Sequence, residues 1–240
     1  MASADGRPPA GELWVAQLGR VGYQEAAELQ DRVRSARQAG TIPDALLLLE
    51  HPPVYTKGRR TAEGDLPMPE DWYAERGIDV VRADRGGRVT YHGPGQLVGY
   101  PIMAIGDVHG YLRTMESALL RALADEGIQA EVREGLTGVW VGERKIASIG
   151  VHVSRRVTTH GFAVNADNDL TPFEWIVPCG IDSVRMTSVS AETARAKSLP
   201  CFRRRVAWRF AEAFGLRQRV VSRHRLVREP AEAAGTPVPA

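Results

Sequence analysis

The sequence predicts a mixed α/β fold of the α+β type, in which helices flank mixed, largely antiparallel sheets. Three segments carry apolar residues at helical spacing, and several short runs are rich in β-branched residues. After residue 127 the strand-like runs are separated by charged or Asn/Asp-rich turns, which is typical of antiparallel pairs. The chain has 240 residues, of which 43% are hydrophobic and 25% charged. This composition is sufficient for one buried core and excludes collagen-like, fibrous and disordered proteins.

The first half of the chain is predicted to begin with a strand and a helix. Residues 13–18 (LWVAQL) have the length and composition of a short strand. Residues 23–38 place Ala26, Leu29 and Val33 at helical spacing, which predicts an amphipathic helix.

Two further strands are predicted before residue 85, with a loop between them. Residues 45–49 (ALLLL) are far shorter than the roughly 20 apolar residues of a membrane span, so they predict a buried strand. Residues 51–60 (HPPVYTKGRR) are polar and contain two prolines, which indicates a loop. A short strand is expected near Val80 and Val81.

The second half is predicted to contain the strongest helix and then a series of strands. Residues 111–125 end before Gly127 and carry apolar residues on one helical face: Leu112, Met115, Leu119, Ala122 and Leu123. Strands are then expected at residues 139–141, 146–153, 157–164 and 173–177.

Both ends of the chain have the composition of linkers. Residues 1–11 and 229–240 are predicted to be disordered tails around a single domain of residues 12–228. The amino-terminal segment lacks a basic stretch followed by an apolar run, so no secretory signal is expected. A cytoplasmic location follows as the expectation, with both thiols of the chain reduced.

The charge of the chain is unevenly distributed. The formal net charge is only +2, which weakens any interpretation as a nucleic-acid-binding protein. Residues 203–228 hold nine arginines and one acid, Glu212, so this basic segment carries +8 and the rest of the chain −6. Within it, residues 206–214 have apolar residues at helical spacing. The segment is either a solvated helix surface or a docking patch for an acidic macromolecule.

Glycine is concentrated in one stretch, with seven glycines in residues 86–110. Such a stretch allows backbone to approach a ligand closely, and it suits a small-molecule site. It is not a dinucleotide fingerprint, because Gly93, Gly95 and Gly99 have the wrong spacing and Pro94 interrupts them. A Gly-rich hairpin without a ligand is the alternative.

Two cysteines and one lysine are candidates for chemistry. Cys179 lies between Pro178 and Gly180 after an apolar run, where a side chain in a turn can face a cleft. It is either a nucleophile or an inert buried thiol. Cys201 has no comparable setting and is predicted to be structural. Lys145 precedes a run of small and apolar residues, and it either activates a thiol or lies exposed in a hairpin.

Other reaction chemistries find less support in the sequence. His160 and His92 are alternative bases or structural histidines, and their spacing does not rank them. No cluster of His, Cys and carboxylate residues has the spacing of metal ligands, so no metal site is expected. The absence of a Gly-x-Ser-x-Gly motif removes the usual serine hydrolase interpretation.

Five motifs in this order together resemble the lipoyl(octanoyl) transferase family. They are EHPPVYTKGRR (50–60), RGGRVTYHGPGQLVGYP (85–101), GERKIASIGV (142–151), THGFAVN (159–165) and PCGI (178–181). The resemblance implies a fold like the catalytic domains of biotin and lipoate protein ligases. It also implies transfer of an octanoyl or lipoyl group from acyl carrier protein to the lysine of a lipoyl domain, the first step of endogenous protein lipoylation.

The resemblance further implies roles for individual residues. It makes Cys179 the nucleophile that carries the acyl thioester, and Lys145 the group that lowers the pKa of the thiol and moves protons. His160 would be an auxiliary group. The implied substrate-binding residues are Arg85, Gly86, Gly87, Arg88, Val89, Thr90, Tyr91, His92, Ser148, Ile149, Gly150, Gly161, Phe162 and Ala163.

The same resemblance sets the expected partners. The donor would be octanoyl-acyl carrier protein, and the acceptors the lipoyl domains of 2-oxoacid dehydrogenase complexes and the H protein of glycine cleavage. No cofactor, nucleic acid or membrane is expected to take part. Two other hypotheses are an ATP-dependent lipoate or biotin protein ligase of the same fold, and a non-catalytic module that binds acyl groups or carrier proteins.

Overall fold

The computed structural model describes residues 11–177, 184–195 and 199–227. The predictions for Cys179 and for the tails at residues 1–10 and 229–240 lie outside these residues. Within the described chain, no helix has the length and apolar character needed to cross a membrane.

The described residues form one large mixed sheet with a spatial order that differs from the order in sequence. Neighbouring strands follow the order β12-β1-β2-β6-β10-β9-β8-β7, and β11 pairs with β9. The pairs β12-β1-β2 are parallel and those from β2 to β7 antiparallel, which confirms the predicted antiparallel second half. The strands are β1 (Glu12–Arg20), β2 (Asp44–Glu50), β6 (Gln96–Ile102), β7 (Glu131–Arg133), β8 (Leu136–Val141), β9 (Arg144–Ser154), β10 (Val157–Asn165), β11 (Arg185–Met186) and β12 (Arg217–Val220).

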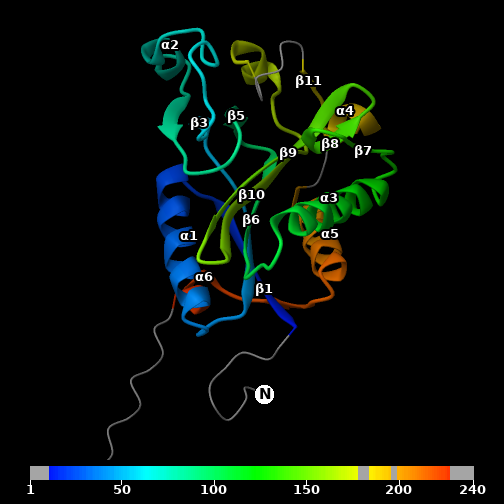
Figure 1. The fold of residues 1–240 in the computed structure, drawn as a ribbon. Coiled ribbons are helices and arrows are strands. Elements are labelled where there is room, and N and C mark those ends of the chain that lie inside the picture. Colours follow the sequence, from blue (N-terminus) through cyan, green and yellow to red (C-terminus); the bar gives the residue numbers. More distant parts are fainter. Residues whose placement is uncertain (1–10, 178–183, 196–198, 228–240) are drawn as a thin grey trace, which may run out of the picture.

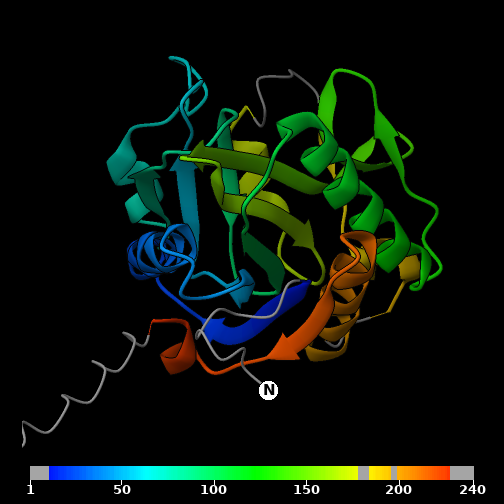
Figure 2. The same cartoon turned by 60° about the horizontal axis from the view of Figure 1, so that its bottom comes forward.

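Helices cover both faces of this sheet (Figure 1). The predicted helix α1 (Tyr23–Gln38) lies on one face, and α3 (Val108–Ala124) and α5 (Leu199–Ala213) lie side by side on the other (Figure 2). Strand β2 shows why its sequence is continuously apolar. Leu46 and Leu48 pack with α3 and α5, whereas Leu47 and Leu49 pack with α1. A strand with both faces buried has no polar positions to alternate with.

The helix ends follow from local capping. Helix α3 begins three residues before the predicted start because Asp107 caps it, and its carboxylate accepts from the N–H groups of His109 (3.1 Å) and Gly110 (2.6 Å). The helical pattern predicted at residues 206–214 belongs to α5, which begins earlier, at Leu199. Three short helices complete the set: α2 (Glu70–Ala74), α4 (Val189–Thr193) and α6 (Arg223–Leu226).

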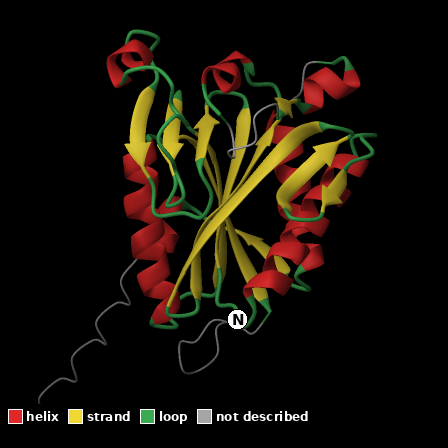
Figure 3. Cartoon of the chain, turned by 45° about the horizontal axis from the view of Figure 1, so that its top comes forward, coloured by secondary structure: helices red, strands yellow, loops and turns green. Residues whose placement is uncertain are grey.

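A second, smaller sheet lies beside the large one and has the order β4-β3-β5. Its strands are β3 (Val54–Lys57), β4 (Asp79–Arg82) and β5 (Val89–His92). Residues 51–60 are therefore not entirely a loop, and the prediction missed β3. The partners that pair with β3 follow more than 20 residues later, so the polar local sequence does not reveal it. In Figure 3 the strands gather in the middle of the molecule and most helices lie outside them.

The Gly-rich stretch connects the two sheets instead of forming a hairpin. Strand β5 pairs with β3 in the small sheet, whereas β6 pairs with β2 and β10 in the large one. Gly95, between them, has a φ of +86°, and a Cβ there would lie 2.9 Å from the backbone of residues 167 and 168. The alternative of a simple hairpin is thus wrong for this segment.

The strand predicted at residues 173–177 is also wrong. Thr171–Trp175 forms a 3-10 helix, with Pro172 in its first turn and the Thr171 N–H bonded to the Asp169 carboxylate at 2.9 Å. Phe173 and Ile176 are apolar because both point into the core of the small sheet, not because they alternate along a strand.

The basic segment is compensated within the fold. Its arginines form ion pairs with acids from distant parts of the chain. The pairs are Arg203 with Glu50 (3.2 Å), Arg205 with Glu126, Arg209 with Asp125 (2.7 Å), Arg219 with Glu12 (3.7 Å) and Arg223 with Glu25 (2.5 Å). Part of the positive charge of the segment is therefore offset by acids of the rest of the chain, through partly exposed pairs that each contribute little to stability.

Candidate active site

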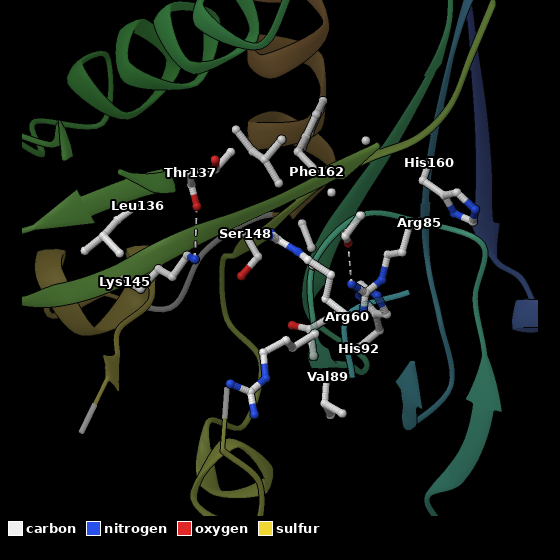
Figure 4. A pocket seen from close by; sticks show the side chains of 18 of the residues that line it. Arg60, Arg85, Val89, His92, Leu136, Thr137, Lys145, Ser148, His160 and Phe162 are labelled. Carbon is white, nitrogen blue, oxygen red and sulfur yellow. Dashed lines mark hydrogen bonds between the residues drawn. The ribbon is translucent and has the colours of Figure 1, made fainter. Parts of the chain in front are cut away.

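A cavity of about 300 Å³ lies between the large and the small sheet (Figure 4). It is lined by every predicted substrate-binding residue except Tyr91, and by Lys145 and His160 as well. Six other residues that line the cavity were not predicted from the sequence: Tyr23, Arg60, Tyr100, Gly135, Leu136 and Thr137. Cys179 lies outside the described residues. The fold thus brings four of the five sequence motifs to one cavity from separate elements.

The cavity extends along strands β9 and β10, and their register shows which residues lie side by side in its wall. Ser148 pairs with Ala163 and Gly150 with Gly161, while Lys145 lies further back along β9. Gly150 lies five positions after Lys145, which corresponds to about 17 Å at roughly 3.4 Å per strand residue. In Figure 4, Lys145 and Thr137 lie on one side of the cavity and Arg85, His92 and His160 on the other. Val89 and Phe162 lie between these two sides, Leu136 lies on the side of Lys145, and Ile149 is a further apolar residue of the lining.

Lys145 is held at one end of the cavity. It lies in β9, its side chain is buried with 3% exposed, and its Nζ donates to the carbonyl of Thr137 at 3.1 Å. The same nitrogen lies 5.2 Å from the centre of the Trp140 ring. Lys145 is therefore not an exposed hairpin lysine.

The segment 85–88 forms part of the opposite wall through internal hydrogen bonds. The buried guanidinium of Arg85 donates to the Thr56 carbonyl at 2.6 Å and also to the Thr56 hydroxyl, so it fixes the segment to β3. Arg88 forms a two-bond pair with the fully buried carboxylate of Asp65. The carbonyl of Asp65 in turn accepts from the N–H of Val177 at 3.0 Å. Asp65 thus connects the cavity wall to the chain that leads toward Cys179.

Tyr91 is the predicted substrate residue that does not line the cavity. Successive side chains of a strand point to opposite faces, and Thr90 and His92 take the cavity face of β5, while Val89 reaches the cavity only at the start of the strand. The ring of Tyr91 packs against Tyr55 and Phe173 instead, with 5.5 Å between ring centres in each pair. Its place is in the core of the small sheet.

The histidines near the cavity are buried. Burial, together with the charge of Arg85, lowers the pKa of His160 to about 4, and burial, the neighbouring His51 and Arg85 lower the pKa of His92 well below its ordinary value. His92 Nδ1 donates to Gln96 at 2.7 Å, and the backbone N–H of His160 donates to Gln30 at 2.6 Å. Both imidazoles are therefore neutral at pH 7. No geometry ranks one above the other as a base.

Burial of neutral imidazoles predicts that the fold weakens in mild acid. The pKa of His51 and of His160 is lowered to about 4, against about 6.5 in an unfolded chain. The unfolded chain therefore binds more protons between these values, so the free energy of unfolding falls as the pH drops below about 6.5 and levels off near 4. At pH 5 we expect a loss of about 2 kcal/mol for each histidine relative to pH 7.5.

Urea denaturation at pH 7.5 and pH 5 measures this loss, and His51→Gln is expected to reduce it. His224→Gln is the matched control, because His224 is exposed. If the free energy of unfolding depends on pH equally in the wild type and in His51→Gln, the lowered pKa of His51 does not cause the loss.

Comparisons with known proteins agree with this arrangement. The family described as the lipoyl protein ligase A/B catalytic domain matches residues 22–211. An octanoyltransferase of Solibacter usitatus is 50% identical over 184 residues, which cover 75% of this chain and 83% of that protein. An octanoyltransferase of Geobacter metallireducens is 46% identical over 202 residues, with 82% and 92% covered. The chain belongs to the octanoyltransferase family. It is therefore an acyltransferase.

A solved structure shows that the octanoyltransferase fold is shared with ligases. A bi-partite lipoate protein ligase of Thermoplasma acidophilum superposes with a TM-score of 0.70 at 19% identity, with 90% of both chains covered. This likeness confirms the predicted ligase-like catalytic fold.

The described residues include no group of three or more His, Cys, Asp or Glu side chains placed to hold a metal ion.

Of the lining residues that were not predicted, some lie within the sequence motifs and others lie where the sequence has no distinctive pattern. Tyr100 lies within the Gly-rich motif, and Arg60 ends the first motif, so the motifs themselves indicate both as binding residues. Gly135 and Thr137 lie in a turn and at a strand start without any distinctive pattern. Tyr23 begins a helix, and only the packing of α1 near β5 and β6 brings it to the cavity.

Proposed function

We propose that this chain transfers an octanoyl group from octanoyl-acyl carrier protein to the lysine of a lipoyl domain, through a thioester on Cys179. The observation that carries the proposal is the cavity, which is lined by apolar side chains suited to an acyl chain and by the buried Lys145. An extended eight-carbon chain spans about 9 Å at roughly 1.3 Å per C–C bond, which is shorter than the roughly 17 Å from Lys145 to Gly150 along β9, so the cavity is long enough to hold it. Family membership supports octanoyl transfer over the ligase of the same fold.

The reaction follows from the two proposed groups. The thiolate of Cys179 attacks the carbonyl carbon of the donor thioester, and the carrier's pantetheine thiol leaves with a proton. The amine of the acceptor lysine then attacks the acyl-enzyme thioester, loses a proton and releases the Cys179 thiolate. The proposed role of Lys145 is to stabilise the thiolate by its charge, to give a proton to the leaving pantetheine thiol and to take one from the acceptor amine. Exchange between thioesters is nearly balanced in energy, so the sequence of steps needs no ATP.

Intact-mass analysis tests the proposal. The chain is mixed with octanoyl-acyl carrier protein and then with a lipoyl domain, with and without ATP. We expect one octanoyl group on the chain, located at Cys179 by peptide fragmentation, and its transfer to the lipoyl domain in both samples. Transfer that requires ATP would support a ligase. Binding of the donor without adduct or transfer would support a non-catalytic module, and either result would overturn the proposal.

The partners proposed for the reaction are those of protein lipoylation. The acceptors are lipoyl domains of 2-oxoacid dehydrogenase complexes and the glycine cleavage H protein, and the proposed location is the cytoplasm. Domains from these proteins can be compared as acceptors in the same mass assay.

A further inference from the structure

We propose that Glu116 is a positioning residue for Lys145 and acts through the peptide group between Thr137 and Gly138. Lys145 Nζ donates to the Thr137 carbonyl at 3.1 Å, and the N–H of Gly138 donates to Glu116 Oε1 at 3.2 Å. The carbonyl and the N–H belong to the same peptide group. The inference rests on the role proposed above for Lys145.

The peptide geometry places opposite charges at its two ends. The described peptide bonds are all trans, so the carbonyl and the N–H of this group point in opposite directions. The carboxylate of Glu116 therefore lies on one side and the Lys145 ammonium on the other. A carboxylate that accepts from the N–H polarises the group and strengthens the carbonyl as an acceptor for the ammonium.

Burial makes this arrangement strong. Glu116 and Lys145 each have 3% of their surface exposed, so water screens the charges little. The second oxygen of Glu116 accepts from Arg113 at 3.0 Å, and the Arg113 side chain is 62% exposed. Glu116 does not line the cavity, so it would not contact the substrate itself.

Gly138 provides the space that the arrangement needs. Its φ of +131° is a conformation that other residues rarely adopt. A Cβ at this position would lie 2.7 Å from Lys145 Cε and 2.6 Å from the Ala147 carbonyl. The lysine side chain thus packs directly on the glycine, and Glu116 of α3 fixes that glycine from the other side.

Three variants test the role of Glu116. Glu116→Ala removes the bond to Gly138, Glu116→Gln keeps an acceptor of the same shape, and Arg113→Ala removes only the exposed partner. For Glu116→Ala we expect kcat to fall about tenfold, which corresponds to about 1.4 kcal/mol, with KM for octanoyl-acyl carrier protein unchanged. The pH midpoint for alkylation of Cys179 should rise. Glu116→Gln should lose no more than about threefold, and Arg113→Ala should match the wild type.

The outcomes separate this inference from the proposed function. A folded Glu116→Ala variant with wild-type kcat and alkylation profile would overturn the role of Glu116, even though the wild type forms the Cys179 adduct. If Glu116→Ala does not fold, Glu116→Met takes its place, because it fills the site without an acceptor for the Gly138 N–H, and wild-type kcat with a wild-type alkylation profile in that variant would overturn the role. A wild type that forms no adduct would instead overturn the proposed function.

Discussion

Replacement of Cys179 by serine is expected to abolish the octanoyl adduct and to lower the rate of octanoyl transfer by at least about 10³-fold. A thiolate is a strong nucleophile near neutral pH, whereas a serine hydroxyl needs a general base to reach comparable reactivity. The substitution changes one atom, so the binding of the donor should be nearly unchanged. Steady-state transfer to a lipoyl domain and intact-mass analysis measure the two effects.

Cys201→Ser is the matched control for this experiment. Cys201 is exposed in the first turn of α5, where its sulfur accepts from Arg204 at 3.3 Å, and it does not line the cavity. The same change of atom at this position should leave transfer at the wild-type rate. A Cys179→Ser variant that still transfers octanoate at the wild-type rate would show that the covalent mechanism is wrong.

The described residues on both sides of Cys179 are anchored near the cavity. Before it, the N–H of Val177 donates to Asp65, whose carboxylate holds Arg88 of the cavity wall. After it, the N–H of Thr187 donates to the Lys145 carbonyl at 2.9 Å, and the Thr187 carbonyl accepts from Asn165 at 3.0 Å. The chain thus enters this segment from one cavity wall and leaves it beside Lys145, which supports the proposed pairing of the thiol and the lysine.

The helices and strands that were predicted correctly contain, within their own residues, the pattern that predicts them. Helix α1 has the predicted bounds because its apolar residues repeat at the helical period. Strands β9 and β10 were found because β-branched residues fill them and a charged turn separates them. In each case the pattern needed for burial is contained within the element itself.

The elements that sequence missed depend on distant partners. Strand β3 is polar and proline-flanked, and it exists because β4 and β5 pair with it from later in the chain. The 3-10 helix at Thr171–Trp175 has apolar residues that a strand would also have, and the hydrogen bond from the Thr171 N–H to Asp169 together with the small-sheet core decides between the two. Local composition does not encode either of these tertiary contacts.

The candidate site shows the same division. Motifs identified most of the residues that surround the cavity, including Lys145. They could not show that Tyr91 points away from it, because the register of β5 decides that. Nor could they identify Glu116 and Thr137, since a backbone carbonyl and a buried acid on a helix have no sequence signature. Positioning groups of this kind become visible only through their hydrogen bonds.

Removal of the Lys145 charge is expected to have the second largest effect. In Lys145→Ala, the pKa of the Cys179 thiol should rise by about two units toward the value of about 8.5 for a free thiol. The thiolate fraction at pH 7 then falls to a few per cent, and proton transfer to and from the substrates loses its proposed carrier. We expect octanoyl transfer at pH 7 to fall by roughly 10²-fold or more. The pH dependence of Cys179 alkylation by iodoacetamide measures the thiol pKa directly.

Two further variants separate charge from packing at this position. Lys145→Met keeps most of the buried volume without the ammonium, so it should behave like Lys145→Ala. Lys145→Arg keeps a positive charge, and it should retain a lowered thiol pKa while transfer falls, because a guanidinium does not release its proton near neutral pH. Alkylation profiles that coincide for the wild type and Lys145→Met would remove the activating role of the lysine. Because Lys145 itself is buried, urea denaturation of each variant must first show that the fold is retained.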